Sequence, residues 1–218
     1  QNHEVYVLRN NKWLWVGSEE VEVGDSVGEP IIQQDRGSTD ISMTICERVT
    51  CSKTINKKHV GVFCDVQRLM GYFLGDGSIN EAEGCIQFDF GTHETQYIED
   101  VSAILLKNFG KNSTAMPKDD VDAIRLKCYS KGMVSWFKNH CYDENSEKIY
   151  PWDISRLSKN DCLNLLVGLI RSDGHSNKTT IAFGNTSTSL IILAKQAFSR
   201  LGFAASINWR LPRTRVLP

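Results

Sequence analysis

Two similar nine-residue segments restrict the fold of this chain more than any other feature of its sequence. Leu69–Gly77 and Leu166–Gly174 both follow the pattern L-x-G-x-x-x-small-D-G, and they lie 97 residues apart. Each is followed by a Phe-Gly pair and then by a helical pattern that ends at a glycine. Agreement over units of this length indicates an internal duplication.

The small residues within each segment predict how two helices pack. Positions i and i+4 of a helix lie on one face. Gly71 with Gly75, and Gly168 with Ser172, therefore give each helix a stripe of very small side chains. Two such stripes can approach each other backbone to backbone. Each helix then ends at a glycine, which we expect in the left-handed conformation that commonly closes a helix.

An aspartate precedes each terminal glycine, so the packed pair would bring Asp76 and Asp173 to one shared end. The negative end of a helix dipole disfavours an anion, and two neighbouring carboxylates repel each other. A divalent cation relieves both conflicts, and hard oxygen ligands favour magnesium. A single Asp-Gly after a helix is usually an ordinary turn. Two copies in register favour a paired site that hydrolyses a phosphodiester.

The chain changes character along its length. Alternating residues predict a β-rich start, followed by strand and linker up to a boundary near Gly61. The expected strands cover residues 4–8, 12–16, 21–27, 85–90, 123–128 and 205–210. The expected helices cover 66–74, 92–109 with Thr92 as its cap, 132–140, and a helix that starts at Ser158 and runs through Ile170. The predicted divisions are residues 1–61, 62–157 and 158–218.

Composition excludes several classes of protein. The chain has 218 residues, of which 41% are apolar and 23% charged, so collagen-like and disordered proteins are excluded. Its longest uncharged apolar-rich run near a helix, Cys162–Ile170, is too short to span a bilayer, and we expect no membrane association. The net charge of −1 argues against general coating of DNA, although residues 174–218 carry basic groups and no acidic one. Seven irregularly spaced cysteines favour free thiols in the cytoplasm.

The two nine-residue segments resemble the signature of the LAGLIDADG homing endonucleases, and with their downstream units the likeness covers about residues 63–218. In that family each repeat is an α-β-β-α-β-β-α unit, the signature helices form a pseudo-twofold interface, and the sheets form a saddle over the major groove of DNA. The resemblance implies an α+β fold with two such repeats, the second incomplete. It also implies a monomer that cuts both strands of a long double-stranded DNA site with Mg²⁺.

The same resemblance implies roles for individual residues. Asp76 and Asp173 would be the catalytic acids and metal ligands, supported by the backbone carbonyls of Gly75 and Ser172. Lys148 lies in a stretch similar to the family's Lys-x-x-Pro, and it would stabilise phosphate charge or activate water. The alternative for Lys148 is an ordinary surface lysine.

The family reads DNA with side chains that alternate along strands, because alternate positions share one strand face. Arginine favours guanine and glutamine favours adenine. The alternative for each candidate is a solvated strand face. Lys53, Lys57 and Lys58 could contact phosphates instead. The candidate base-reading residues are Gln87, Asp89, Arg125, Lys127, Asn208 and Arg210.

The start of the chain is similar to an intein splicing domain, which is an all-β, Hint-like fold. In such a domain a Thr-x-x-His block is followed by strands with the pattern W-V … L-x-x-G-D-x-V. This chain has the same order: Asn2-His3-Glu4-Val5 comes first, Trp15-Val16 second and Glu22–Val27 third. His3 would correspond to the histidine that assists the N-terminal acyl shift. The preceding threonine, the splicing nucleophile, the final His-Asn pair and the rest of the second repeat are not in the sequence. We therefore expect a fragment that cannot splice alone and whose own nuclease activity is in doubt.

Three functional hypotheses follow. The first is an intein-borne, site-specific DNA endonuclease. The second is an intein insert whose nuclease has decayed. The third is a non-catalytic DNA- or RNA-binding module of the same fold, either a transcription regulator or an intron maturase. Both aspartates are present, which argues against decay and against a regulator, and the splicing-like start argues against a maturase.

Overall fold

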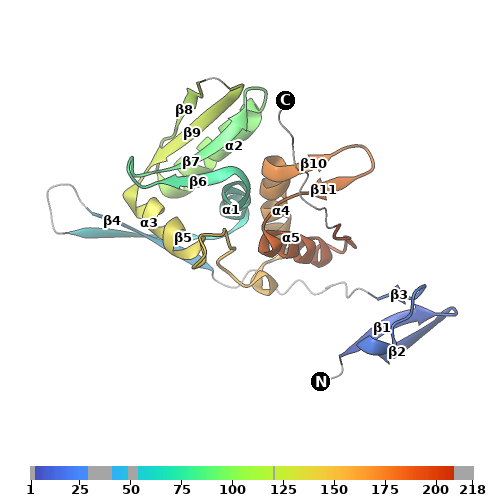
Figure 1. The fold of residues 1–218 in the computed structure, drawn as a ribbon. Helices are drawn as coiled ribbons and strands as arrows, with labels where there is room; N and C mark the ends of the chain where they lie inside the picture. The colour runs from blue at the N-terminus through green and yellow to red at the C-terminus, as the bar shows by residue number, and fades with distance from the viewer. Residues whose placement is uncertain (1–2, 29–40, 49–53, 120, 209–218) are drawn as a thin grey trace.

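The computed structural model describes residues 3–28, 41–48, 54–119 and 121–208, in which helices and strands are mixed (Figure 1). The expected α+β class is therefore confirmed. Of the described helices, none is both long and apolar enough to cross a membrane. The described cysteines have free thiols.

The first strands form a small antiparallel sheet in the order β2-β1-β3. The expected strand at 21–27 is wrong over most of its length, because only Ser26 and Val27 pair with β1. Before them the chain turns back, with the Asp25 amide bonded to the Glu22 carbonyl and Gly24 at φ 108°. The bounds are β1 (Glu4–Arg9), β2 (Lys12–Gly17), a short 3-10 helix (Ser18–Glu20) and β3 (Ser26–Val27).

A second hairpin occupies the region expected to be strand and linker. Strands β4 (Ser42–Arg48) and β5 (Ile55–Gly61) pair in antiparallel register. Their side chains Met43, Ile45 and Val60 belong to the same buried core as the helices that follow. The predicted division at residue 61 stays a prediction, but the hairpin packs across it.

Residues 64–140 contain one complete α-β-β-α-β-β-α unit around an antiparallel sheet in the order β6-β7-β9-β8. One face of the sheet is buried, with Phe88 on β7 and Leu126 on β9 in the core. The bounds are α1 (Cys64–Asp76), β6 (Gly77–Asn80), β7 (Cys85–Gly91), α2 (Thr95–Ile104) with a π-helical turn (Leu105–Phe109), β8 (Thr114–Pro117), β9 (Ala123–Tyr129) and α3 (Lys131–His140).

For α2, the structure confirms the predicted C-terminal end but not the predicted N-terminal cap. Gly110 closes the helix in the left-handed conformation, with φ 65°, as a terminal glycine should. Thr92 does not cap it, because Glu94 is the capping residue and the Thr92 hydroxyl instead donates to Asp122 at 2.6 Å.

A shorter unit follows a 3-10 turn (Ile154–Arg156), and its order of helix, strand, strand and helix matches that of α1, β6, β7 and α2. The Ser158 hydroxyl accepts the Asp161 amide and starts α4, as predicted. The expected strand at 205–210 is wrong over 205–208, where the described chain forms no strand, and Arg210 lies outside the described residues. The bounds are α4 (Lys159–Asp173), β10 (Gly174–Ser176), β11 (Ile181–Phe183) and α5 (Thr188–Arg200).

Helices α1 and α4 pack side by side at the centre of this part of the protein (Figure 1). A Cβ on Gly71 would lie 2.3 Å from the Leu165 carbonyl oxygen, and one on Gly168 would lie 2.2 Å from the Arg68 carbonyl oxygen. Nothing larger than glycine fits either position without moving a backbone. The predicted close approach of the two helices is confirmed.

The glycines that end these helices serve a different purpose from the one predicted. Gly77 and Gly174 have φ of −74° and −100°, so neither is left-handed. Both are required for space: a Cβ on Gly77 would lie 2.5 Å from the Phe73 Cα, and one on Gly174 would lie 2.4 Å from the Ile170 Cα. The chain turns into β6 and β10 directly against the last turn of each helix.

Candidate functional site

The two signature aspartates lie at adjoining helix ends. Asp76 is the last residue of α1, and Asp173 is the last residue of α4. The contact between the helices continues to this end, because a Cβ on Gly75 would lie 1.9 Å from the Ser172 hydroxyl and 3.5 Å from Oδ2 of Asp173. The structure therefore brings together the two acids and the two small residues that the sequence singled out.

The electrostatics of the site show that the two carboxyl groups influence each other. Asp76 retains an exposed surface. Even so, the protein atoms around its carboxyl group and the negative charge of Asp173 raise its pKa to about 6. Lys148 opposes this shift by favouring the charged form. Asp76 therefore keeps its proton to a higher pH than an ordinary aspartate, unless a positive charge lies close to it.

Lys148 supplies such a charge from the segment between α3 and α4. Its backbone forms an antiparallel bridge with Tyr142, and its Nζ donates to the Gly75 carbonyl oxygen. Burial lowers the pKa of Lys148, while the charges of Asp173 and Asp76 oppose that change. Its ammonium also lies 5.8 Å from the ring centroid of Phe73. Lys148 is therefore a half-buried part of the site and not an ordinary surface lysine.

Asn185 is a site residue that reading the sequence missed. Its Nδ2 donates to Oδ2 of Asp173 at 2.7 Å, while its Oδ1 accepts the Ser187 amide at 2.8 Å. The second bond fixes the orientation of the amide, so the NH₂ group must face the acid. The sequence held no clear signal for it, because Thr92, which follows Phe90-Gly91 in the first unit as Asn185 follows Phe183-Gly184, bonds Asp122 and not Asp76.

A hollow of about 370 Å³ adjoins these groups. Gly75 and Lys148 line it on one side, and the segment from Asn185 to Ser187 lines it on the other. Asn185 bonds Asp173, and Lys148 bonds the carbonyl of Gly75, which precedes Asp76, so the hollow adjoins residues that contact the acid pair. Its volume lies at the lower end of the range of small-ligand pockets.

The donors present fit a hard cation bound partly by substrate or water. The described residues contain no group of three or more His, Cys, Asp or Glu side chains able to hold a metal. Two carboxylates and the carbonyls of Gly75 and Ser172 are all oxygen donors, and Mg²⁺ is commonly held by one or two carboxylates plus phosphate and water. The Ser172 hydroxyl is turned into its own helix, where it donates to the Gly168 and Leu169 carbonyls at 3.0 Å. Only its backbone carbonyl could serve as a ligand.

Four of the six candidate base-reading residues share one face of the β6-β7-β9-β8 sheet. Gln87 pairs in register with Lys127, and Asp89 pairs with Arg125. These side chains alternate with the buried Phe88 and Leu126, as period two requires. Asn208 is exposed and lies outside any strand, and Arg210 lies outside the described residues.

The charged side chains on this face are paired with one another. Arg125 holds Asp89 with two hydrogen bonds of 2.7 and 2.8 Å, and Lys118 binds the same carboxylate at 2.9 Å. Lys127 binds Glu83 at 2.6 Å. Arg125 and Lys127, which the sequence suggested as base-reading residues, are thus already bound to the carboxylates of Asp89 and Glu83. Contact with DNA would have to exchange these ion pairs.

Other predicted residues lie elsewhere. Lys57 and Lys58 lie on the exposed strand β5 and line a hollow of about 190 Å³ together with Lys111, while Lys53 lies outside the described residues. His3 is exposed just before β1, and its carbonyl accepts the Ser18 amide at 2.8 Å. Their predicted roles stay predictions.

Comparison with known proteins finds a family model that matches part of the chain. The family described as a LAGLIDADG-like domain matches residues 64–140, which run from α1 to the end of α3. The uncharacterized protein MJ0043 of Methanocaldococcus jannaschii is 27% identical over 214 residues, a match that covers 94% of this chain and 26% of that protein. The chain therefore spans about a quarter of the length of that relative.

Solved structures with a similar arrangement include two kinds of protein. Mesophilic variants of the homing endonuclease I-DmoI align with a TM-score of 0.49 and 14% identity, over 69% of this chain and 82% of theirs. I-DmoI in complex with DNA and manganese aligns with a TM-score of 0.48 and 15% identity, over 68% and 82%. Full-length DUF199/WhiA of Thermotoga maritima aligns with a TM-score of 0.46 and 14% identity, over 67% and 47%.

Proposed function

We propose that this chain, whose residues 64–140 form a LAGLIDADG-like domain, is a site-specific DNA endonuclease that acts as a monomer on a long double-stranded site. Asp76 and Asp173 are its catalytic acids. The observation that supports this best is the backbone contact between α1 and α4, which leads to two carboxyl groups close enough for Asp173 to raise the pKa of Asp76. An acid pair at two negative helix ends is costly unless it binds a cation.

In this proposal, different residues of the site bind the metal ion and the phosphate. Asp76, Asp173 and the carbonyls of Gly75 and Ser172 would hold Mg²⁺. When bound, Mg²⁺ supplies Lewis-acid polarisation of the phosphate and lowers the pKa of bound water. Lys148, which lies beside the acids, would donate to a phosphate oxygen as negative charge develops there. The scissile phosphate would enter through the hollow between Lys148 and the segment from Asn185 to Ser187, which adjoins residues that contact the acids.

Recognition of the DNA site would use the outer face of the β6-β7-β9-β8 sheet. Arg125 would exchange Asp89 for a guanine edge, and Gln87 would bind adenine. The Gln87 Nε2 already donates to Ser78 at 3.0 Å, and its Oε1 is a buried acceptor without a partner among the described residues. An amide with one unsatisfied atom is suited to turn towards a base. Asp89, Lys127, Asn208 and Arg210 would add contacts, and Lys57 and Lys58 would bind phosphates.

The β-rich start supports the further proposal that the nuclease is carried by a cytoplasmic intein. Gly24 adopts φ 108°, and Asp25 accepts two hydrogen bonds from Arg9 at 2.8 and 2.7 Å. The Gly-Asp pair of the splicing-like pattern thus forms a turn directly before β3, and Arg9 holds this turn against the end of β1. In this proposal His3 assists the acyl shift in the longer protein.

A non-catalytic DNA-binding module is the second candidate, and one observation favours it. Lys148 already donates to the Gly75 carbonyl and balances the charge of both acids. The cluster could therefore persist as a structural ion group without a cation. A transcription regulator or a decayed nuclease would retain the fold, bind DNA and leave it intact.

Cleavage of a randomised duplex library separates these candidates. The purified protein is incubated with Mg²⁺ and linear duplexes that contain a long random segment, and both bound molecules and new ends are sequenced. The endonuclease proposal expects enriched sites and new ends on both strands. Asp76→Asn and Asp173→Asn should enrich the same sites without producing ends. Asp119→Asn, at an exposed acid outside the site, is the control and should cut normally. Enrichment without ends for the parent protein would support the non-catalytic candidate.

A further inference from the structure

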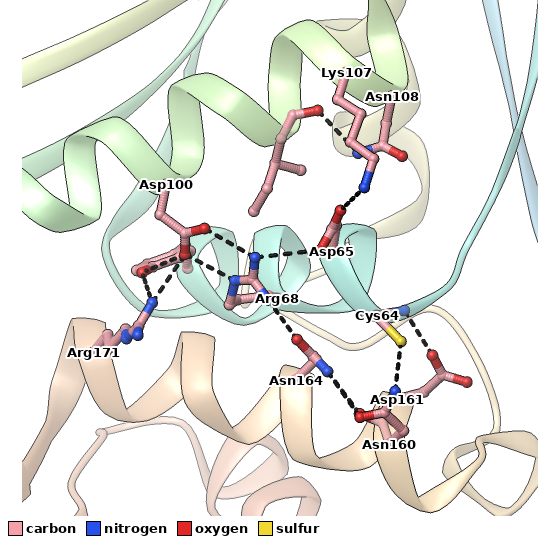
Figure 2. Close-up of polar contacts among 12 residues, drawn as sticks. Cys64, Asp65, Arg68, Asp100, Lys107, Asn108, Asn160, Asp161, Asn164 and Arg171 are labelled. Carbon is pink, nitrogen blue, oxygen red and sulfur yellow. Dashed lines mark hydrogen bonds and ion pairs between the residues drawn. The ribbon is translucent and has the colours of Figure 1, made fainter.

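A polar network joins the helices α1, α2 and α4 (Figure 2). At its centre is Asp100 of α2, which accepts hydrogen bonds from both helices of the central pair. Arg68 of α1 donates through Nε and Nη2 at 2.8 and 2.9 Å, and the Tyr72 hydroxyl donates at 3.2 Å. Arg171 of α4 donates to the same carboxylate at 2.9 Å. One side chain of α2 therefore ties α1 to α4.

The two arginines extend this connection along the interface. Arg68 also donates to Asn164 of α4, and Arg171 donates to the Tyr72 hydroxyl of α1 at 3.0 Å. Each arginine thus crosses from its own helix to the other. The side chains of Arg68 and Asp100 are only 20% and 21% exposed, so solvent screens this pair less than a surface ion pair.

The glycine contact gives the network its importance. Helices usually fix their relative position by fitting ridges of side chains into grooves. Where Gly71 meets Gly168, backbone lies on backbone. That contact sets the distance between the helices. Charged hydrogen bonds are directional, and partly buried polar groups are best known for specifying one register among several.

The network is also close to the acids whose separation it would set. Tyr72 precedes Asp76 by one helical turn, and Arg171 precedes Asp173 by two residues. A shift of α4 along α1 that broke the bond between Arg171 and Tyr72 would move the two carboxylates apart by a similar amount.

The face of α5 that packs on α4 is mainly apolar. Helix α5 packs there with the apolar residues Leu190, Leu193, Ala194 and Ala197. Its buried Arg200 donates to the Leu157 carbonyl instead of to α4. The Cys64 amide of α1 also donates to Asp161 of α4 at 2.7 Å, but at the first turns of the two helices, far from the acids. Near the acids, the polar contacts between α1 and α4 described above lie on the α2 side.

We propose that Asp100 is a positioning residue, which holds α1 and α4 in the register where Asp76 and Asp173 face one cation. This inference rests on the proposed function, because the register of the two helices affects activity only if Asp76 and Asp173 bind the same cation. Asp100 acts through Arg68 and Arg171, and it contacts neither acid itself.

The test compares Asp100→Asn with Glu99→Gln, which removes the same charge from an exposed neighbour on α2. In metal-free protein, nuclear magnetic resonance reports the contact between the Hα atoms of Gly71 and Gly168. Calorimetry then measures affinity for Mn²⁺ alone. We expect Asp100→Asn to weaken the glycine contact and to lower Mn²⁺ affinity about tenfold or more. Glu99→Gln should change neither.

A triple variant separates positioning from mere stabilisation. Replacing a buried ion cluster by apolar residues is often neutral or stabilising, so Arg68→Leu/Asp100→Leu/Arg171→Leu should remain folded in thermal melts. Positioning predicts that it still lacks the parent's glycine contact and Mn²⁺ affinity. If it retains both, the network only stabilises the fold and the proposal is overturned. If the parent binds no Mn²⁺, the proposed function fails, while the glycine contact still decides the question of register.

Discussion

Gly71 of α1 and Gly168 of α4 meet backbone to backbone: a Cβ added to either would lie 2.8 Å from the Cα of the other. This contact sets how close the two helices come. It also determines how close Asp76 and Asp173 lie at the helix ends. The spacing of small residues and the position of the acids are therefore one feature of the fold.

Replacing either interface glycine should separate the helices. Gly71→Leu forces a large side chain into the Leu165 carbonyl, and core overpacking of this kind costs about 1–3 kcal/mol or more. Urea denaturation measures the loss in free energy of unfolding. Gly184→Leu is the matched control, because a Cβ there meets nothing within 4 Å. If both variants lost the same free energy of unfolding, close packing of the two helices would not be the reason for the loss at Gly71.

Stability should fall with rising pH across the titration of Asp76. Its pKa in the folded protein is about 6, above the ordinary value of 3.8, so the folded state holds the proton more tightly than the unfolded state. The free energy of unfolding is then highest below about pH 4 for this group and decreases up to about pH 6. Urea denaturation at pH 4.5 and pH 7 tests this, since Asp76→Asn should flatten the difference. A parent protein that gains stability over this range through Asp76 would contradict the assigned shift.

Lys148→Met should slow DNA cutting more than it weakens DNA binding, because the ammonium lies beside the acids and the hollow. Rates and affinities on a site recovered from the library give the comparison. Lys138→Met removes a lysine that pairs with Glu81 on the exposed surface and should change neither. A loss of affinity at an unchanged cutting rate would leave Lys148 as a phosphate contact only.

Asn185→Leu should weaken cation binding, because Asp173 loses the donor that orients its carboxylate. A loss of about tenfold in Mn²⁺ affinity is typical of removing a residue that orients a metal ligand. Thr92→Val tests the matching position of the first unit, where the hydroxyl bonds Asp122 and not Asp76. Equal losses in the two variants would show that the contact of Asn185 has no special role.

Arg125→Ala should relax base preference at one position of the enriched site, at a cost of about 1–3 kcal/mol. Lys57→Ala should instead weaken binding to all sequences alike. Sequencing of bound library molecules distinguishes the two patterns. A uniform loss for Arg125→Ala would place this residue on the phosphate backbone.

Much of the helix pair could be predicted from the sequence, because its signals are local. The i and i+4 small residues, the Ser158 cap and Gly110 each act within one or two turns. The conformation of Gly77 and Gly174 was predicted wrongly for the opposite reason. Space against Phe73 and Ile170, and not backbone φ, requires glycine there, and that crowding exists only once the chain has turned into the next strand.

The polar contacts of the site could not be predicted, since they join distant residues. Asp100 meets Arg171 across 71 positions, and Lys148 meets Gly75 across 73. The acids that pair with Arg125 and Lys127 likewise depend on strand register, which alternation alone does not specify. The hairpin at β4 and β5 was predicted only as strand and linker, because its apolar residues find their partners in a later helix.

Calorimetric titration of metal-free protein with Mn²⁺ at pH 7 tests most directly whether the two aspartates share a cation. We expect the parent and Asp119→Asn to bind with the same affinity, and we expect both Asp76→Asn and Asp173→Asn to lose that binding. Retention of the parent's affinity by either single variant would show that the two carboxylates do not hold one cation between them.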